Sequence, residues 1–217
     1  MNFAQARFNM IEQQIRPWNV LDAGVLELLS TVSRDAFVPP AQKALAFADL
    51  EIPLPGGQCM LAPRLEARLL QDLALQPHES VLEVGTGSGF MAALLSHRAA
   101  QVLSVELLPE LVEMARANLQ KAGIANVTVH QDDGAKLSAA LGTFDAIVLS
   151  GSVAQVPHDL LQRLNVGGRL LAIVGDEPQM RATLVTRTSS TDFRTTQPWD
   201  ANAPRLQNFT EPSRFQF

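Results

Sequence analysis

Apolar residues recur three and four positions apart through much of residues 1–75, as they do on the buried face of a helix. The pattern is clearest in residues 8–15 (FNMIEQQI), 23–32 (AGVLELLSTV) and 62–75 (APRLEARLLQDLAL). Proline is tolerated in the first turn of a helix, so Pro63 is compatible with the last of these segments. The first third of the chain is therefore predicted to be helical.

A different pattern begins at residue 81, where short and almost continuously apolar stretches alternate with amphipathic ones. The apolar stretches are predicted to be strands, at residues 81–85, 101–107, 126–132, 144–150 and 169–175. The amphipathic stretches are predicted to be helices, at residues 89–97, 109–123 and 158–165. Strands that are apolar on both faces are typical of a parallel sheet covered by helices on both sides. The predicted fold class is α/β, with a Rossmann-like, mostly parallel sheet.

The C-terminal region has the β-branched content of strands rather than the periodicity of helices. Residues 182–196 (ATLVTRTSSTDFRTT) are predicted to form two strands joined by a turn near residues 189–192. The closing segment, residues 204–217 (PRLQNFTEPSRFQF), is predicted to be a final antiparallel strand added to the parallel sheet.

Composition and charge narrow the classes of partner. The 217-residue chain has a formal net charge of −5, and neutralising phosphates needs a basic surface, so no nucleic-acid partner is expected. No stretch approaches the ~20 consecutive apolar residues of a membrane span. Cys59 is the only cysteine, which excludes an internal disulfide and fits a reducing compartment. We therefore expect a cytoplasmic protein without a membrane partner.

Three glycines follow the first predicted strand in residues 81–90, VLEVGTGSGF. Gly85, Gly87 and Gly89 could form a tight turn without any ligand, but three glycines at alternate positions exceed what a turn requires. Their spacing also differs from the G-x-G-x-x-G pattern of dinucleotide sites. Glu83, two residues before the first glycine, is a poor neighbour for a pyrophosphate and suits a ligand that carries positive charge.

Acidic residues also end the next two predicted strands. Glu106 lies about 20 residues beyond the first glycine, where a carboxylate accepts hydrogen bonds from a ribose diol. Asp133 is suited to accept from an exocyclic adenine amine, and Gly134 allows close approach of the backbone, although adjacent acids are often only a solvated turn. Because the carboxyl ends of parallel strands share one edge of a sheet, these side chains are expected to meet there. A nucleoside with a cationic, amino-bearing arm fits them, and S-adenosylmethionine is such a molecule.

The motifs VLEVGTGSGF, VELLPEL, DDGAKL, FDAIVLS and GGRLLAIVG resemble, in order and spacing, those of class I S-adenosylmethionine-dependent methyltransferases. More narrowly, MIEQQIRPWNV, RDAFVPP, the stretch from GGQ to APR and the closing PSRFQF are similar to the protein-L-isoaspartate O-methyltransferase family. The resemblance covers essentially the whole chain. It implies a helical N-terminal substrate and cofactor cap (1–75) on a methyltransferase core (76–217) that forms one compact unit.

The same resemblance implies a reaction and a cofactor site. The family transfers a methyl group from S-adenosylmethionine to the carboxylate of isoaspartyl residues in damaged proteins, which is a repair reaction, and leaves S-adenosylhomocysteine. Thr86 and Leu107 join the cofactor-binding residues on this basis. The acceptor carboxylate is already ionised at neutral pH, so no general base and no catalytic residue is assigned. The four histidines show no metal-ligand spacing, and no metal is expected.

The turn before the cofactor strand departs from the family pattern G-x-T-I-S-x-P. Leu61 stands at the position of the serine and Cys59 at that of the threonine. Arg64 could bring a replacement charge to the acceptor, or it could be a solvated helix arginine. The resemblance implies six substrate-binding residues, which are Cys59, Met60, Leu61, Pro63, Ser150 and Gly151.

Because of Leu61, two alternatives stay open beside isoaspartyl methylation. One is a class I methyltransferase for another acceptor, such as a small molecule or RNA. The other is a cofactor-binding homologue that has lost activity.

Overall fold

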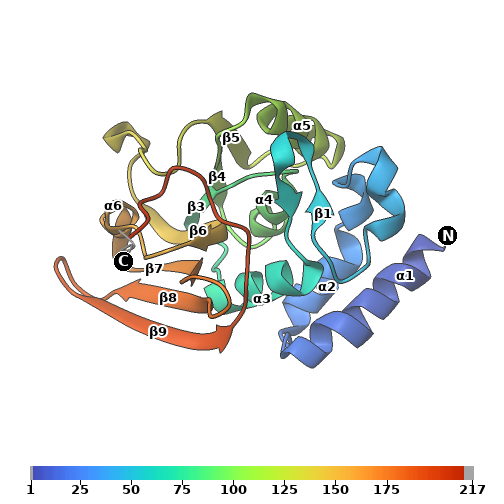
Figure 1. Ribbon diagram of the computed structural model, residues 1–217, viewed down its shortest axis with the longest axis horizontal. Helices are drawn as coiled ribbons and strands as arrows, with labels where there is room; N and C mark the ends of the chain where they lie inside the picture. Colours follow the sequence, from blue (N-terminus) through green and yellow to red (C-terminus); the bar gives the residue numbers. More distant parts are fainter. Residues whose placement is uncertain (1, 213–217) are drawn as a thin grey trace, which may run out of the picture.

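A seven-stranded sheet runs through the centre of the protein in this computed structural model, which describes residues 2–212 (Figure 1). The strands lie in the order β5-β4-β3-β6-β7-β8-β9. Neighbours from β5 to β7 are parallel, whereas β8 is antiparallel to β7 and β9 to β8. The strands are β3 (Ser80–Val84), β4 (Gln101–Glu106), β5 (Val127–Gln131), β6 (Phe144–Val153), β7 (Leu164–Val174), β8 (Arg181–Arg187) and β9 (Phe193–Asp200). All five predicted parallel strands and the predicted β8–β9 hairpin are thus confirmed.

The chain order reverses between β3 and β6, which lie side by side at the centre of the sheet. Chains leaving neighbouring strands at such a switch point turn to opposite sides, which opens a crevice at the carboxyl ends. The fold therefore places the glycine loop, which follows β3, at the edge where an open α/β sheet binds ligands.

Helices precede and alternate with the strands, as predicted. They are α1 (Phe3–Met10), α2 (Ala23–Thr31), α3 (Pro63–Leu73), α4 (Phe90–Ser96), α5 (Pro109–Lys121) and α6 (His158–Leu161). The chain between α2 and α3 contains a two-stranded hairpin of β1 (Ile52–Pro53) and β2 (Cys59–Met60). It also contains three 3-10 segments, which are Arg34–Ala36, Pro40–Leu45 and, between the two strands, Pro55–Gly57. Among the described residues, no helix is long and apolar enough to cross a membrane.

Local sequence signals explain where these helices begin. The Asp22 side chain accepts a hydrogen bond from the backbone N–H of Val25 at 2.8 Å and so caps α2. Pro63 and Pro109 each occupy the first position of their helix, where the absent N–H would have no helical partner. Gly123, which follows α5, has a φ of 72° and ends the helix in a left-handed conformation.

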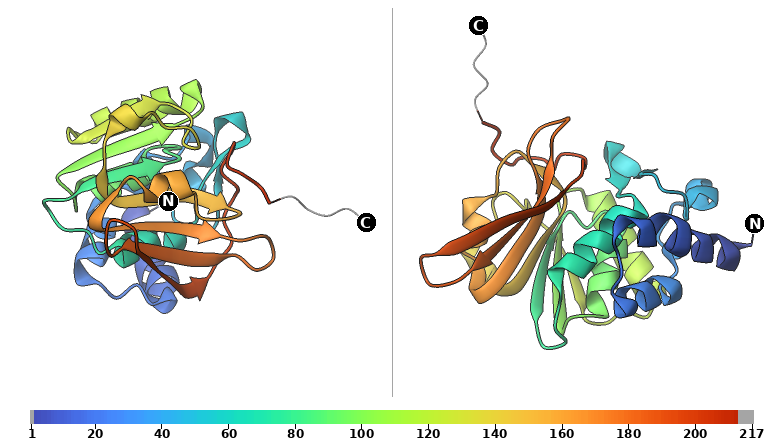
Figure 2. Two further views of the ribbon diagram at one scale, coloured as in Figure 1. Left: turned by 90° about the vertical axis from the view of Figure 1, so that its left-hand side faces the viewer. Right: turned by 90° about the horizontal axis from the view of Figure 1, so that it is seen from below.

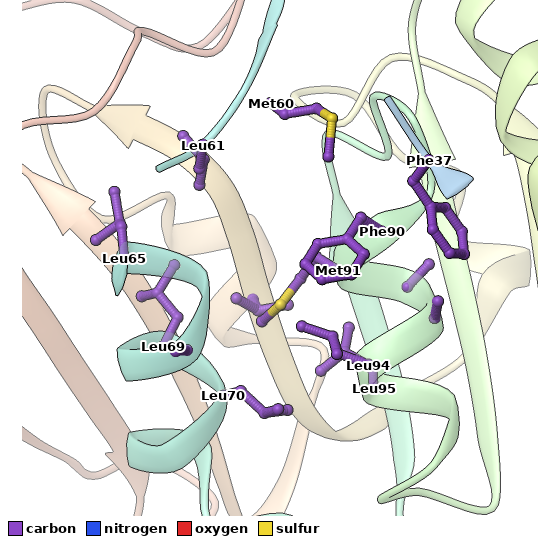
Figure 3. Close-up of a cluster of buried hydrophobic side chains, with 14 of the residues drawn as sticks. Phe37, Met60, Leu61, Leu65, Leu69, Leu70, Phe90, Met91, Leu94 and Leu95 are labelled. Atoms are coloured by element: carbon purple, nitrogen blue, oxygen red, sulfur yellow. The ribbon is translucent and has the colours of Figure 1, made fainter. Parts of the chain in front are cut away.

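Each face of the sheet buries its own apolar cluster. On one face, Val81 and Val148 belong to a large core with the N-terminal helices, α3, α4 and α5. Figure 3 shows part of this core, in which leucines of α3 such as Leu69 face Met91 and Leu94 of α4. The other face has a smaller cluster, to which α6 contributes Leu160. Helices thus flank both faces, but most of the helical cover lies on one. The N-terminal helices lie at one end of the molecule and the β8–β9 hairpin at the other (Figure 2).

Two predicted segments differ from the structure. The helix predicted at residues 158–165 ends at Leu161, because Leu164 already pairs with Phe144 as the first residue of β7. The strand predicted at residues 204–217 forms only an isolated parallel bridge, between Arg205 and Ser152, in its described part. The antiparallel end of the sheet is confirmed, but β8 and β9 form it.

The tail instead returns to the middle of the sheet, where β6 ends. The backbone N–H of Ser152 donates to the Pro204 carbonyl at 2.7 Å, and the N–H of Leu206 donates to the Ser152 carbonyl at 2.9 Å. Ser152 still pairs with Ile173 of β7, but the β3–β6 ladder ends at Leu149, so the tail bonds β6 beyond the end of β3. Residues 213–217 of the predicted strand lie outside the described residues.

Candidate active site

A pocket lies at the carboxyl edge of the sheet and collects most of the residues predicted to bind cofactor. Residues that the sequence had singled out and that line it are Cys59, Gly85, Gly87, Glu106, Leu107, Asp133, Gly134 and Ser150. Cys59 comes from β2, Glu106 ends β4 and Ser150 lies in β6. The other five lie in the loops that follow β3, β4 and β5. The structure therefore joins residues up to 91 positions apart, Cys59 and Ser150 being the extremes.

Two of the glycines are needed for backbone reasons. Gly85 has a φ of 94°, and a Cβ there would lie 3.0 Å from Cδ2 of Leu206. A Cβ on Gly134 would collide with the side chain of Val84. Both positions bring bare backbone to the pocket wall, as the glycine pattern predicts.

Glu106 is only 7% exposed, and both of its carboxylate oxygens are held by hydrogen bonds. Its Oε2 accepts from the backbone N–H of Gly87 at 2.9 Å, and its Oε1 accepts from the N–H of Leu108 at 3.0 Å. Each carboxylate oxygen can accept a second hydrogen bond. Glu106 therefore both fixes the glycine loop and presents free acceptor capacity to the pocket, as a ribose-binding acid must.

The Asp133 carboxylate is oriented by its own loop and by the C-terminal tail. Its Oδ1 accepts from the N–H of Ala135 at 3.0 Å, and its Oδ2 accepts from Nδ2 of Asn208 in the tail at 3.1 Å. Asn208 has a φ of 66°, which is uncommon for a residue other than glycine. The left-handed turn at Asn208 thus brings the tail to the acid predicted to bind adenine.

The tail is the part of the pocket that the sequence did not predict. Leu206, Gln207 and Phe209 all line it, although the sequence suggested a strand in this region. These tail residues reach the pocket because of the bridge between Arg205 and Ser152, and no sequence pattern in the tail predicts that bridge. Leu108 and Leu111 were also missed, but they lie one and four residues after Leu107, so helical periodicity could have found them.

A smaller cavity continues from this pocket. It lies between residues 59–62, which we call the β2–α3 turn, and the glycine loop of residues 85–89. It shares Cys59, Gly85, Gly87 and Ser150 with the pocket. Its other lining residues are Met60, Leu61, Glu66, Glu83, Thr86, Ser88, Phe90 and Met91. Met60, Leu61, Glu83 and Thr86, which the sequence had assigned to the site, are thus placed here.

Three predicted site residues line neither space. Pro63 is buried at the start of α3. Gly89 packs against Ala115 of α5. Gly151 lies under the tail, where a Cβ would approach Leu206 to 2.8 Å. They support the walls of the site from behind.

Glu83 is fully buried in a short hydrogen-bonded network. Ser104 Oγ donates to Oε2 at 2.5 Å, Ser150 Oγ donates to Oε1 at 2.8 Å, and Thr86 Oγ1 lies 2.6 Å from Ser104 Oγ. Burial raises the pKa of Glu83 to about 8, against the opposing effect of the two serine hydrogen bonds. Burial likewise raises the pKa of Glu66 to about 7, although the Arg34 guanidinium beside it acts in the opposite direction.

The raised pKa of Glu83 predicts that the free energy of unfolding falls as the pH rises between about 5 and about 8. In that window the folded protein keeps a proton on Glu83 that the unfolded chain, with a carboxyl pKa near 4.5, has released. The fall approaches about 1.4 kcal/mol per pH unit for this group. Urea unfolding at a series of pH values measures it.

Glu83→Gln should flatten this pH profile, because the amide does not titrate. Glu27→Gln is the matched control, since Glu27 is exposed on α2. A profile for Glu83→Gln as steep as that of the unchanged protein would contradict the protonation of Glu83.

The β2–α3 turn holds two of the residues that depart from the family pattern. Burial, followed by the nearby Glu51 carboxylate, raises the pKa of the Cys59 thiol to about 12, so the thiolate needed for nucleophilic attack does not form near neutral pH. Leu61 is only 4% exposed and turns its isobutyl group into the smaller cavity. The turn is therefore apolar where the family pattern has a hydroxyl.

Arg64 is not available to replace that hydroxyl. Its Nη1 lies 2.6 Å from Oδ2 of Asp49, and its guanidinium stacks over the Trp18 ring at 4.1 Å from the centroid. Its charge is therefore already paired with Asp49 and stacked on Trp18. Within residues 2–212, no group of three or more His, Cys, Asp or Glu side chains is placed to hold a metal ion.

The central glycine loop, the acids on the two following strands and the strand order together define a class I methyltransferase fold. The same fold occurs in a crystal structure described as a protein-L-isoaspartate O-methyltransferase from Plasmodium falciparum in complex with S-adenosyl-L-homocysteine. The two chains superpose with a TM-score of 0.81 at 18% identity, over 95% of this chain and 99% of the other.

Sequence comparisons identify the family. The family model described as Protein-L-isoaspartate(D-aspartate) O-methyltransferase matches residues 5–198. A protein-L-isoaspartate O-methyltransferase of Methanoculleus marisnigri is 38% identical over 169 residues, which cover 78% of this chain and 77% of the relative. One of Koribacter versatilis is 38% identical over 185 residues, or 85% of this chain and 83% of the relative. The chain belongs to the protein-L-isoaspartate O-methyltransferase family.

Proposed function

We propose that this protein transfers a methyl group from S-adenosylmethionine to the carboxylate of L-isoaspartyl residues in damaged proteins. The observation that carries the proposal is the family match over residues 5–198, which includes the glycine loop and strand ends of the pocket and the N-terminal segments that precede them. The free thiol of Cys59 suits a reducing environment, and we place the reaction in the cytoplasm.

The pocket fits the adenosine part of this cofactor. We assign Glu106 to the ribose hydroxyls, because both of its oxygens are fixed by backbone N–H groups and retain acceptor capacity. We assign Asp133 to the exocyclic amine of adenine. Gly85, Gly87 and Gly134 let the backbone approach, and Leu107 and Phe209 supply apolar walls for the base.

The smaller cavity fits the cationic arm. Glu83 lies at its wall, and a cation there would favour the ionised carboxylate over the protonated form. Cys59, Met60, Leu61 and Ser150 then form the side toward the acceptor, with Pro63 and Gly151 supporting them. We propose the N-terminal segment 1–75 as the cap that completes this side, on a core of residues 76–217.

The chemistry asks for alignment rather than for acid–base groups. When bound, S-adenosylmethionine supplies a methyl group on a sulfonium, which needs no further activation. The acceptor carboxylate is ionised at neutral pH, so the protein has no proton to remove. The glycine loop and the β2–α3 turn have to hold the two reactants in line and exclude water, and such alignment contributes roughly 7 to 11 kcal/mol.

Methyl transfer from tritiated S-adenosylmethionine to an isoaspartyl peptide tests the proposal. The same peptide with an ordinary aspartyl residue is the matched control, because it differs only in which carboxylate is free. We expect base-labile label in the isoaspartyl peptide alone. Turnover no higher than the enzyme-free blank, in a protein that binds S-adenosylhomocysteine, would reject it.

Leu61 favours a second candidate, a methyltransferase whose acceptor is less polar than a carboxylate. A lost hydrogen bond to a charged group costs roughly 1.5 to 3 kcal/mol, whereas an apolar wall gains by contact with an apolar acceptor. Incubation of the protein and tritiated cofactor with a small-molecule extract distinguishes the two. Label that enters metabolites and not the isoaspartyl peptide would support this candidate.

The hydrogen bond from Asn208 to Asp133 gives a prediction of modest size. Asn208→Ala should weaken binding of S-adenosylhomocysteine by about two- to tenfold, because a partly exposed hydrogen bond contributes roughly 0.5 to 1.5 kcal/mol. Titration calorimetry measures the change, and Asn202→Ala, an exposed tail residue, is the control. Equal affinities for the two variants would show that the tail does not orient Asp133.

A further inference from the structure

Arg34 is a fully buried arginine that the proposed reaction leaves unexplained. It lies in the RDAFVPP segment and is 1% exposed. A charge taken out of water is costly unless it is paired and hydrogen-bonded. Because burying this guanidinium is costly, the groups that it bonds indicate its role.

The partners of Arg34 surround the β2–α3 turn. Its Nη2 donates to the backbone carbonyl of Leu61 at 2.7 Å, its Nη1 donates to Oε2 of Glu66 in the first turn of α3, and its Nε donates to the carbonyl of Ala46 at 3.1 Å. One planar group thus holds the residue at the family serine position through its main chain. The hold does not depend on which side chain stands at position 61.

Arg34 also reaches the cofactor half of the site. Its guanidinium lies over the Phe90 ring, 4.9 Å from the centroid, and Phe37 of the same segment packs edge-on against that ring at 5.5 Å. Phe90 is the first residue of α4, directly after Gly89 of the glycine loop. Figure 3 shows Phe37 beside Phe90, with Leu61 at the end of the segment leading into α3.

From these contacts we infer that Arg34 is the positioning residue of the acceptor turn. It fixes the Leu61 backbone against the helix that follows the glycine loop, and so sets where an acceptor meets the methyl donor. Glu66 is its counter-ion and orients the guanidinium. The inference rests on the proposed function only in naming the turn as the acceptor side, since the contacts themselves belong to the unliganded fold.

A second arginine provides a matched control at the other end of α3. Arg169 donates to the carbonyl of Leu73, the last residue of α3, at 2.7 Å and pairs with Glu79 through both of its terminal nitrogens. This pair also joins a carbonyl of α3 to a carboxylate. Glu79 directly precedes β3 and Arg169 lies within β7, so the pair is at the opposite end of the strands from the pocket. Removing the Arg169–Glu79 pair therefore measures how the loss of a similar ion pair affects the fold without affecting the site.

The double variant Arg34→Met/Glu66→Met removes the pair without leaving an unpaired buried charge, and apolar replacement of buried pairs is often tolerated. We expect kcat/KM for the isoaspartyl peptide to fall at least about tenfold, because small misplacements of reactants cost up to about 100-fold. The Kd for adenosine should stay within about threefold, since the residues assigned to adenosine keep their contacts. Arg169→Met/Glu79→Met should change neither quantity.

Hydrogen exchange of the amides of residues 59–62 provides a measurement that needs no acceptor. Exchange there should accelerate about tenfold or more in Arg34→Met/Glu66→Met and not in the control pair. If the unchanged protein does not methylate the peptide, the proposed function fails, and exchange alone decides on Arg34. Unchanged exchange, or equal losses of kcat/KM and of affinity for adenosine, would overturn the inference.

Arg34→Lys covers the case in which the double variant does not fold. Lysine keeps the charge beside Glu66, but its single nitrogen lacks the fork that bonds the Leu61 and Ala46 carbonyls together. It should shift both measurements in the same direction as the double variant. A folded Arg34→Lys protein with normal kcat/KM and normal exchange at residues 59–62 would also overturn the inference.

Discussion

Glu106→Ala is expected to weaken binding of S-adenosylhomocysteine by about 10- to 150-fold. This corresponds to the roughly 1.5 to 3 kcal/mol of hydrogen bonding to a charged group. The loss has two sources. The carboxylate proposed to accept from the ribose hydroxyls disappears, and the N–H groups of Gly87 and Leu108 lose the acceptor that fixes the glycine loop. Titration calorimetry of the folded variant measures the change.

Two further variants accompany this measurement. Glu113→Ala removes an equally charged but exposed side chain of α5 and should leave the affinity unchanged. Glu106→Gln keeps one acceptor oxygen, while its NH₂ group would face one of the two backbone N–H donors, so its affinity should also fall. An affinity for Glu106→Ala equal to that of the Glu113 control would remove the ribose assignment.

Leu61→Ser is expected to raise kcat/KM for an isoaspartyl peptide by about 10- to 100-fold. The hydroxyl restores a donor for the acceptor carboxylate, which contributes roughly 1.5 to 3 kcal/mol. The gain depends on a turn that is already in place, and the bond from Arg34 to the Leu61 carbonyl holds it without using the side chain. Peptide methylation at saturating cofactor measures the effect.

The same substitution should lower stability, because Leu61 is 4% exposed and belongs to the large core. Truncating a buried leucine costs about 2 to 5 kcal/mol. Leu61→Ala is therefore the control, since it loses the same apolar contacts without gaining a hydroxyl. Equal peptide kinetics for the Ser and Ala variants would show that the hydroxyl is not used, and would favour the apolar acceptor.

The two substitutions address the two halves of the site. The cofactor half is made of rigid parts, namely strand ends, a glycine loop and carboxylates whose orientation is fixed by backbone N–H groups. The proposed acceptor half is the β2–α3 turn, in which Arg34 holds the Leu61 carbonyl. On this proposal, a substitution at position 61 would alter the acceptor side while the cofactor pocket stays as it is.

Local sequence was sufficient for the strands of the main sheet and for the residues that line the pocket at the strand ends. Apolar runs located β3, β4, β6 and β7, because a strand buried on both faces needs a continuous apolar sequence. The edge strand β5 is mostly exposed and shows only alternating valines. Glu106 and Asp133 were found because parallel strands bring successive strand ends to one edge, so spacing along the chain becomes proximity in space.

Only the tertiary structure decided the rest. The tail bonds to Ser152 because β6 extends beyond the end of β3 and has no partner strand on that side. The length of β3 is set far from the tail, so no pattern within residues 204–212 could predict that Leu206 and Phe209 line the pocket. Arg34 appears in the sequence as an ordinary charged residue between two apolar segments. Its burial, and its bond to the backbone of Leu61, arise because three distant segments close around it, and hydrophobic patterning encodes which residues are buried but not which carbonyl a buried guanidinium will meet.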